Sequence, residues 1–158
     1  MNDLIEALRK KPNAQACVTG SEKYPSLKGQ VRFYRVCGGV LVRAEITGLP
    51  KGESGKSPIF AFHIHEGGQC AGNDRDPFAD VKGHYNPTDL SHPYHAGDLP
   101  PLFGVNGTAF SVFLTDRFTV CEILNRAVII HAMPDDLTTQ PSGNAGEKIA
   151  CGIIKPTA

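Results

Sequence analysis

The chain has 158 residues, a length that suits one domain burying roughly 68–70% of its unfolded surface, and nothing in it implies a second domain. Its 16 lysine and arginine residues balance 16 aspartate and glutamate residues, so the overall charge argues against nucleic acid or an anionic membrane as a partner. No apolar stretch approaches membrane-spanning length, and we therefore expect a soluble protein.

The first 14 residues predict a short helical extension. Leu4, Ile5 and Leu8 recur at helical spacing, and Pro12 ends the pattern. The same segment lacks the basic start and the apolar run of a signal peptide. We therefore expect a cytoplasmic protein, with a periplasmic or extracellular protein whose signal peptide has been removed as the alternative.

Residues 15–158 form the expected main domain, in which short alternating strands are separated by Gly, Pro, Asn and Asp. This pattern predicts an all-β sandwich or flattened barrel with strands at residues 16–19, 30–36, 40–46, 59–65, 108–113, 127–131 and 150–154. Two long stretches without strands lie at 66–104 and 132–148. In a compact domain, loops of that length are usually functional.

All six histidines lie between residues 63 and 131. His63 and His65 are two apart in an alternating strand, so both rings project from one face and the phenylalanine and isoleucine residues between and before them project from the other. The remaining candidate ligands are His84 in a turn-rich sequence, His92, His95 and Asp98 in a loop, and His131 after an apolar run. Six imidazoles and one carboxylate are enough to bind two adjacent transition-metal ions.

The order of several short segments is more specific than any one of them. These segments are residues 63–65, 83–84, 95–99, 131, 143–146 and 150–152, together with Cys70 and Cys151. In this order they resemble the copper/zinc superoxide dismutases, and the resemblance covers residues 16–155. It implies the fold of that family, a Greek-key β-sandwich or flattened eight-stranded barrel with long metal-binding and electrostatic loops.

The resemblance also implies two metal sites. Copper would be bound by His63, His65, His84 and His131, and zinc by His84, His92, His95 and Asp98. His84 occurs in both sets because its ring bridges the two metals in the family. Asp135 matches the family's aspartate that accepts hydrogen bonds from one histidine of each site and so fixes both rings.

The implied activity is the conversion of superoxide to oxygen and hydrogen peroxide, in which His84 would take and return a proton. In the family, an arginine shortly before the second disulfide cysteine docks the anion beside copper, and this chain has Lys148 there. Lysine keeps the charge but loses the planar, multi-donor shape of arginine. Lys148 and His84 are therefore the catalytic candidates, and a reduced activity is implied.

The same family resemblance predicts a disulfide between Cys70 and Cys151. Five cysteines leave at least one thiol unpaired in any intramolecular scheme. We expect Cys17, Cys37 and Cys121 to be small buried apolar residues, and a second disulfide among them stays open.

Two other functions stay open. A protein that buffers zinc or copper with little turnover would also explain the ligands, and Lys148 favours it. A purely structural sandwich does not explain why every histidine joins one constellation. For partners we expect superoxide as substrate, no nucleic acid or membrane, and either a monomer or a homodimer.

Overall fold

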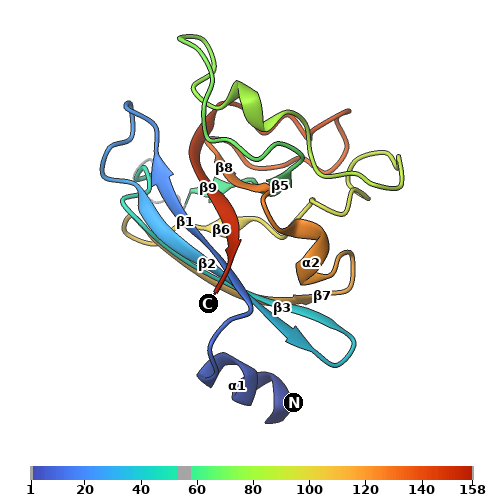
Figure 1. Ribbon diagram of the computed structural model, residues 1–158. Helices are drawn as coiled ribbons and strands as arrows, with labels where there is room; N and C mark the ends of the chain where they lie inside the picture. Colours follow the sequence, from blue (N-terminus) through green and yellow to red (C-terminus); the bar gives the residue numbers. More distant parts are fainter. Residues whose placement is uncertain (1, 53–57, 158) are drawn as a thin grey trace.

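The computed structural model describes residues 2–52 and 58–157 (Figure 1). Its main sheet is antiparallel and curled, with seven strands in the order β5-β8-β9-β1-β2-β3-β7, and β4 and β6 form a separate pair. The strands are β1 (Ala14–Gly20), β2 (Lys28–Val36), β3 (Gly39–Thr47), β4 (Ile59–Phe60), β5 (Phe62–His65), β6 (Leu102–Phe103), β7 (Thr108–Thr115), β8 (Ala127–His131) and β9 (Lys148–Pro156). The helices are α1 (Asn2–Arg9), the 3-10 helix η1 (Ala79–Val81) and α2 (Val120–Ile123). The predicted all-β sandwich is confirmed.

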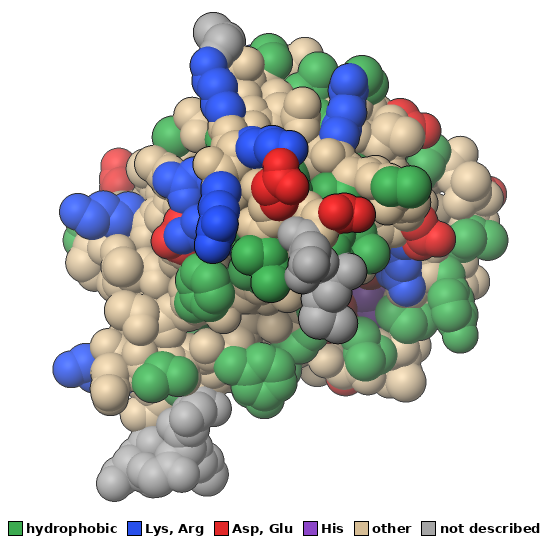
Figure 2. All heavy atoms as spheres, turned by 90° about the horizontal axis from the view of Figure 1, so that it is seen from below, with side chains coloured by type: hydrophobic (Ala, Val, Ile, Leu, Met, Phe, Trp, Pro, Cys, Tyr) green, Lys and Arg blue, Asp and Glu red, His purple; other side chains and the backbone are tan. Residues whose placement is uncertain are grey.

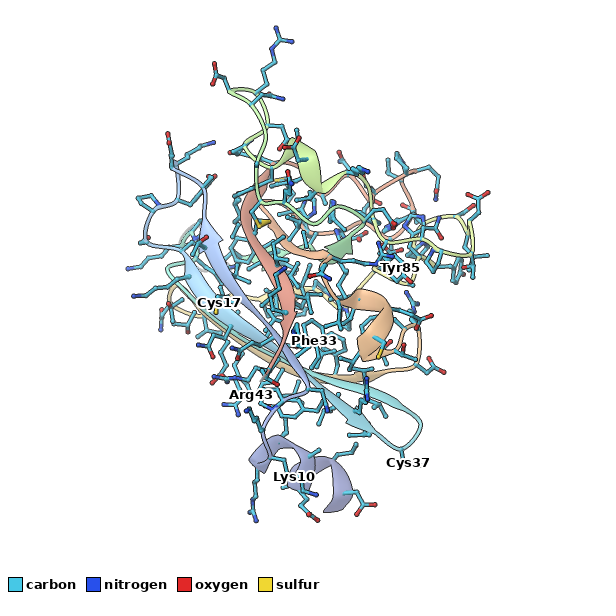
Figure 3. The ribbon with its side chains drawn as sticks, in the orientation of Figure 1. Lys10, Cys17, Phe33, Cys37, Arg43 and Tyr85 are labelled. Atoms are coloured by element: carbon cyan, nitrogen blue, oxygen red, sulfur yellow. A yellow bond between two sulfur atoms is a disulfide. The ribbon has the colours of Figure 1, made fainter. Side chains whose placement is uncertain are left out.

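The core lies between the two halves of the curled sheet. Strands β1, β2, β3 and β7 form one wall, and β5, β8 and β9 form the other (Figure 1). Val31 and Phe33 of β2 join Phe62 and Ile64 of β5 and Ile130 of β8 in one buried cluster, and Figure 3 shows Phe33 inside the sandwich. Burying each such side chain contributes roughly 1.5–3 kcal/mol, so this cluster fixes β5 against the opposite wall.

The predicted strand at 59–65 is wrong in one respect, because it is interrupted at Ala61. Before Ala61, β4 pairs with β6, and after it, β5 pairs with β8. The Ala61 amide donates to the Met133 carbonyl (2.8 Å), and the His131 amide donates to the Ala61 carbonyl (2.9 Å). Strands β4 and β6 have two residues each, too few for alternation to reveal. The described residues therefore contain nine strands, two more than the seven ranges predicted from alternation, because the strand at 59–65 is divided and β6 was not predicted.

Helix α1 confirms the predicted N-terminal helix. It lies beside β2 at one end of the sandwich (Figure 1). Leu4 and Leu8 are partly buried, whereas Ile5 is 53% exposed. The division between a 1–14 extension and a 15–158 domain stays a prediction. No helix in the described part of the chain is long and apolar enough to cross a membrane.

The prediction of burial is wrong for three cysteines. Cys17, Cys37 and Cys121 are free thiols with exposed side chains. Cys17 lies on β1 between the buried Ala16 and Val18, so the alternation of the strand turns it outward. Cys37 lies at the tip of the hairpin between β2 and β3 (Figure 3).

The predicted disulfide between Cys70 and Cys151 is present, with an S–S distance of 2.02 Å. Cys70 lies in the long loop after β5, and Cys151 lies in β9. The bond therefore ties that loop to the wall of the sandwich from which the histidines emerge.

Charged side chains of both signs are interspersed on the face shown in Figure 2, as expected for a chain without net charge. On neighbouring strands β2 and β3, Arg32 and Arg43 both pair with Glu45. Histidine side chains hardly reach the surface in this view. Five of the six histidines are buried, and His84 is partly buried.

Candidate metal centre

The loop after η1 packs directly on β5. Isolated bridges pair His65 with His84 and His63 with Asp98, and backbone hydrogen bonds on both sides of Ile64 hold the loop to the strand. Strand β8, which pairs with β5, ends in the same place. Segments far apart in the sequence therefore deliver their imidazoles to one end of the sandwich.

Two groups of four candidate ligands result. One group consists of His63, His65, His84 and His131, and the other of His84, His92, His95 and Asp98. Within each group, the candidate ligand atoms all lie within 4.8 Å of one another. All seven predicted residues are brought together, and His84 belongs to both groups.

Asp135 links the two groups, because it accepts a hydrogen bond from one histidine of each. Its Oδ2 accepts a hydrogen bond from Nε2 of His63 (2.7 Å), and its Oδ1 accepts one from Nε2 of His92 (2.8 Å). A carboxylate only accepts, so both histidines carry their proton on Nε2 and leave Nδ1 with a lone pair. Both Nδ1 atoms are buried without a hydrogen-bond partner. A buried lone pair without a partner is costly, and a bound cation would satisfy both of them.

Gly143 covers this bridge and has no room for a side chain. Its φ is 70°, in the left-handed region that favours glycine. A Cβ there would lie 2.0 Å from Oδ1 of Asp135 and 2.7 Å from Nε2 of His92. The glycine therefore lets the loop close over the two hydrogen bonds.

His65 and His131 present lone pairs to each other. Nδ1 of His65 donates to the Lys82 carbonyl (2.8 Å), and Nδ1 of His131 donates to the Gly146 carbonyl (3.3 Å). Their two Nε2 atoms lie 3.3 Å apart. With both protons on Nδ1, neither Nε2 can donate to the other, so the pair is stabilised only by a cation between them or by a proton.

The ring of His84 stands between the groups. Its Nδ1 lies 2.7 Å from Oδ1 of Asp98 and 3.4 Å from Nδ1 of His95. Its Nε2 is buried and has no hydrogen-bond partner, and its ring centroid lies 3.9 Å from that of His63. One nitrogen is thus available to each group, as the prediction of a bridging histidine requires.

The sequence model of the copper/zinc superoxide dismutases (SODC) matches residues 27–154. The chain belongs to this family. It is 37% identical over 139 residues to the Cu-Zn superoxide dismutase of Legionella pneumophila, covering 83% of this chain and 80% of that one. It is 33% identical over 142 residues to Cu-Zn superoxide dismutase 1 of Aquifex aeolicus, covering 80% and 79% of the two chains. A crystal structure of a double mutant of a superoxide dismutase-like protein from Bacillus subtilis matches with a TM-score of 0.71 and 28% identity, over 88% of this chain and 95% of that chain.

Copper and zinc, the metals of the copper/zinc superoxide dismutases, fit the two groups. Four imidazoles suit copper, and three imidazoles with one carboxylate suit tetrahedral zinc. The unpartnered buried nitrogens of His63, His84 and His92 belong to these groups, which is the arrangement that a bound cation would complete.

Burial lowers the pKa of three histidines of this centre, His63, His65 and His131, and so favours their neutral form. It lowers the pKa of His65 well below the ordinary value and lowers the pKa of His131 to about 3. Burial opposes the charge of Asp135, but hydrogen bonds from His63, the Leu137 amide and His92 hold the pKa of its carboxyl well below the usual range. Neutral imidazole nitrogens thus lie close to the negative charge of Asp135, and this combination favours a cation.

This arrangement predicts that the metal-free protein loses stability on mild acidification. The pKa of His65 and His131 is lowered in the folded state, so the unfolded chain binds more protons below its own pKa of about 6.5. The free energy of unfolding should therefore fall as the pH drops from about 6.5 toward about 3. The measurement is urea unfolding of metal-free protein at about pH 7 and about pH 5. Both pH values lie above the ordinary pKa of aspartate and glutamate, so the change in the free energy of unfolding reports mainly on histidine.

A His131→Gln variant serves as the control for this pH effect. Its urea midpoint should fall less between the two pH values, because one of the three rings with a lowered pKa has been removed. Equal midpoints for the unsubstituted protein at both pH values would contradict the prediction.

The opening of the first group is a pocket lined by residues that include Lys82, Lys148 and His131. Lys148 does not stand free there, because its ammonium group pairs with the carboxylate of Asp76. Asp76 also accepts a hydrogen bond from the Phe78 amide (3.0 Å). Burial opposes the charge of Asp76, but these contacts together keep the pKa of its carboxyl below the usual value.

Sequence reasoning did not find Asp76 or Lys82. Both lie in the loop after β5, which has no strand or helix pattern around Asp76, and Asp76 is 72 residues from its partner Lys148. Nothing in the local sequence of Asp76 indicates that contact. The disulfide at Cys70 was the one signal that this loop returns to β9.

Proposed function

We propose that the protein is a copper/zinc superoxide dismutase, which converts superoxide to oxygen and hydrogen peroxide. The observation that carries this proposal is His84, whose two ring nitrogens serve two groups of ligands at once. A storage site for one metal has no need of a shared imidazole. An enzyme that couples electron transfer to proton transfer does.

Copper would be held by His63, His65, His84 and His131, where it would supply one-electron chemistry by accepting an electron from one superoxide anion and returning it to a second. Zinc would be held by His84, His92, His95 and Asp98 and would order the loop.

The residues of the chain would supply a proton and the positions of the ligands. His84 would supply one of the two protons of hydrogen peroxide, because its Nε2 would lose a proton when it bridges the groups and take one up when it does not, and solvent would supply the other proton. Asp135 would hold the rings of His63 and His92 with their Nδ1 atoms aimed at the two groups.

The attraction of the anion would come from Lys148 and Lys82 at the mouth of the pocket. The contact of Lys148 with Asp76 places a negative charge beside it, which weakens that attraction. This contact therefore favours the alternative function, a protein that binds zinc or copper with little turnover.

We expect the substitution Asp76→Asn to raise the rate of superoxide decay at low ionic strength, on the order of a few-fold. Asparagine keeps an acceptor oxygen for the Phe78 amide but no longer neutralises Lys148. Asp74→Asn is the matched control, because Asp74 lies exposed in the same loop. An equal rise in both variants would assign the effect to net charge, and no rise in Asp76→Asn would count against docking by Lys148.

The function itself is tested by pulse radiolysis of superoxide on protein reconstituted with copper and zinc. Metal content is counted in the same sample, and ionic strength is varied. A copper-dependent decay that slows with salt supports a dismutase that steers its anion. Stoichiometric copper with negligible decay supports the metal-binding function, and failure to bind copper removes the catalytic assignment.

For the compartment, the Cys70–Cys151 disulfide favours an oxidising environment. It therefore supports the periplasmic or extracellular alternative over the predicted cytoplasm. Rapid alkylation of thiols in intact cells, followed by mass spectrometry, would report whether Cys70 is oxidised in place. The expectation of a monomer or homodimer stays a prediction.

A further inference from the structure

The second group of ligands, His84, His92, His95 and Asp98, is called the zinc group below. The loop that supplies it has no helix or strand of its own. Residues 82–101 lie between η1 and β6, and they contribute all four residues of that group. The middle of the loop is held by Gln140, which accepts from the His92 amide (3.0 Å) and donates to the His92 carbonyl (2.7 Å). Residues 93–96 lie between this contact and Gly97 and Asp98, which are held to β5 through the backbone.

Arg117 contacts this stretch of the loop. Its Nη1 lies 3.0 Å from the carbonyl oxygen of Pro93, 3.3 Å from that of His95 and 3.2 Å from that of Asp98. Two of these carbonyls belong to residues of the zinc group itself. One charged group therefore contacts three backbone carbonyls of the loop at a single point.

The backbone around Arg117 is well anchored. Arg117 lies between β7 and α2, and its amide donates to Oγ1 of Thr115 (3.3 Å). The next residue, Phe118, is buried in the core. Thr119 and Glu122 then form a capping box that begins α2. The guanidinium group is thus fastened to the sandwich and not to the loop that it contacts.

We propose that Arg117 is a positioning residue for the zinc group, which orders residues 93–98 before the metal binds. This inference rests on the assignment of zinc under the proposed function. All three carbonyls contact one guanidinium nitrogen, Nη1, and share its two N–H groups, so the positive charge carries much of the contact and a lysine ammonium could supply part of it. Ordering a loop in advance lowers the cost of binding, so loss of Arg117 should appear as weaker zinc binding.

The test compares Arg117→Gln and Arg117→Lys with the unsubstituted protein. Zinc affinity is measured on copper-free protein by competition with a chromophoric chelator, and amide hydrogen exchange is followed over residues 92–98 in metal-free protein. Arg117→Gln should lower zinc affinity about tenfold and speed exchange in that segment, with less than about a twofold change in affinity for copper(II). Arg117→Lys should restore part of both, and Arg9→Gln on α1 should change neither.

Unchanged zinc affinity and exchange in Arg117→Gln would overturn the inference. An equal loss of copper and zinc together with a lower unfolding midpoint would also overturn it, because it would show general destabilisation. If Arg117→Gln does not fold, Arg117→Lys decides by the same readouts. If the unsubstituted protein binds no zinc, the zinc assignment fails, and exchange in the metal-free variants still decides whether Arg117 orders the loop.

Discussion

Replacing Asp135 with asparagine is expected to weaken the binding of both metals, by about 10–100-fold each. Asp135 accepts hydrogen bonds from Nε2 of His63 and Nε2 of His92 on its two oxygens. Asparagine has one acceptor oxygen, so its amide group would meet one of these N–H groups donor to donor. The affected ring must then rotate or move its proton to Nδ1, the atom that faces the metal group.

Gly143 makes this substitution hard to accommodate. It packs so closely over the bridge that a Cβ there would meet Oδ1 of Asp135 at 2.0 Å, so the loop leaves little room for a rotated amide or ring. The conflict between the asparagine amide and the histidine that it faces would therefore persist in the folded protein. Because the bridge also fixes the separation of the two groups, a disturbance at one histidine should reach the other.

Copper(II) and zinc affinities of Asp135→Asn, measured separately by chelator competition, test this expectation. Asp136→Asn is a close control, because Asp136 is exposed and its carboxylate accepts from the amides of Thr138 and Thr139, which asparagine can still satisfy. The control should keep both affinities within about twofold. A loss confined to one metal, or no greater than that of the control, would show that the bridge does not couple the sites.

The histidine pair on β5 could be predicted because a strand has period two, and that rule holds even though the predicted strand breaks at Ala61. His63 and His65 still leave the same face, since the break precedes both of them. The two groups of ligands were implied by a resemblance. Spacing alone indicates that His92, His95 and Asp98 share a loop, but it does not show how a loop without regular structure is held.

The contacts that hold and charge the site could not be predicted, because they join residues distant in sequence. Lys148 pairs with Asp76 across 72 positions, and Arg117 meets His95 across 22. Only folding brings such pairs together, and the sequence around each of these charged residues does not distinguish it from an ordinary charged residue on the surface. The exposure of Cys17 is different, since its neighbours on β1 alternate and the sequence contained the signal.

Removing the Cys70–Cys151 disulfide is expected to lower the free energy of unfolding of the metal-free protein by about 4–5 kcal/mol. The two cysteines are separated by 81 residues, so the bond closes a long loop and restricts the unfolded chain strongly. The double substitution Cys70→Ala and Cys151→Ala removes the cross-link. Alanine is preferred at position 151 because that side chain is buried and serine would bury a hydroxyl.

Urea unfolding under oxidising conditions measures the loss, and reduction of the unsubstituted protein separates its causes. Reduction breaks the cross-link without removing atoms, so any further loss in the double variant belongs to the packing of Cys151. Cys17→Ala, which changes an exposed free thiol, should stay within about 0.5 kcal/mol of the unsubstituted protein. A double variant no less stable than this control would contradict the chain-entropy argument.

Reduction of the disulfide also tests whether the bond positions the loop after β5, which carries Asp76, in addition to stabilising the fold. The Gly67 amide donates to the Val81 carbonyl (2.7 Å), and the Asp80 amide donates to the Ala71 carbonyl (2.9 Å), so the loop that carries Asp76 is also closed by its own backbone. These bonds do not depend on the sulfur atoms. The reduced protein, while folded, should therefore retain the contact between Asp76 and Lys148, and its response to Asp76→Asn should match that of the oxidised protein. If reduction alone reproduced the effect of Asp76→Asn, the disulfide and not the backbone would be what holds Asp76 against Lys148.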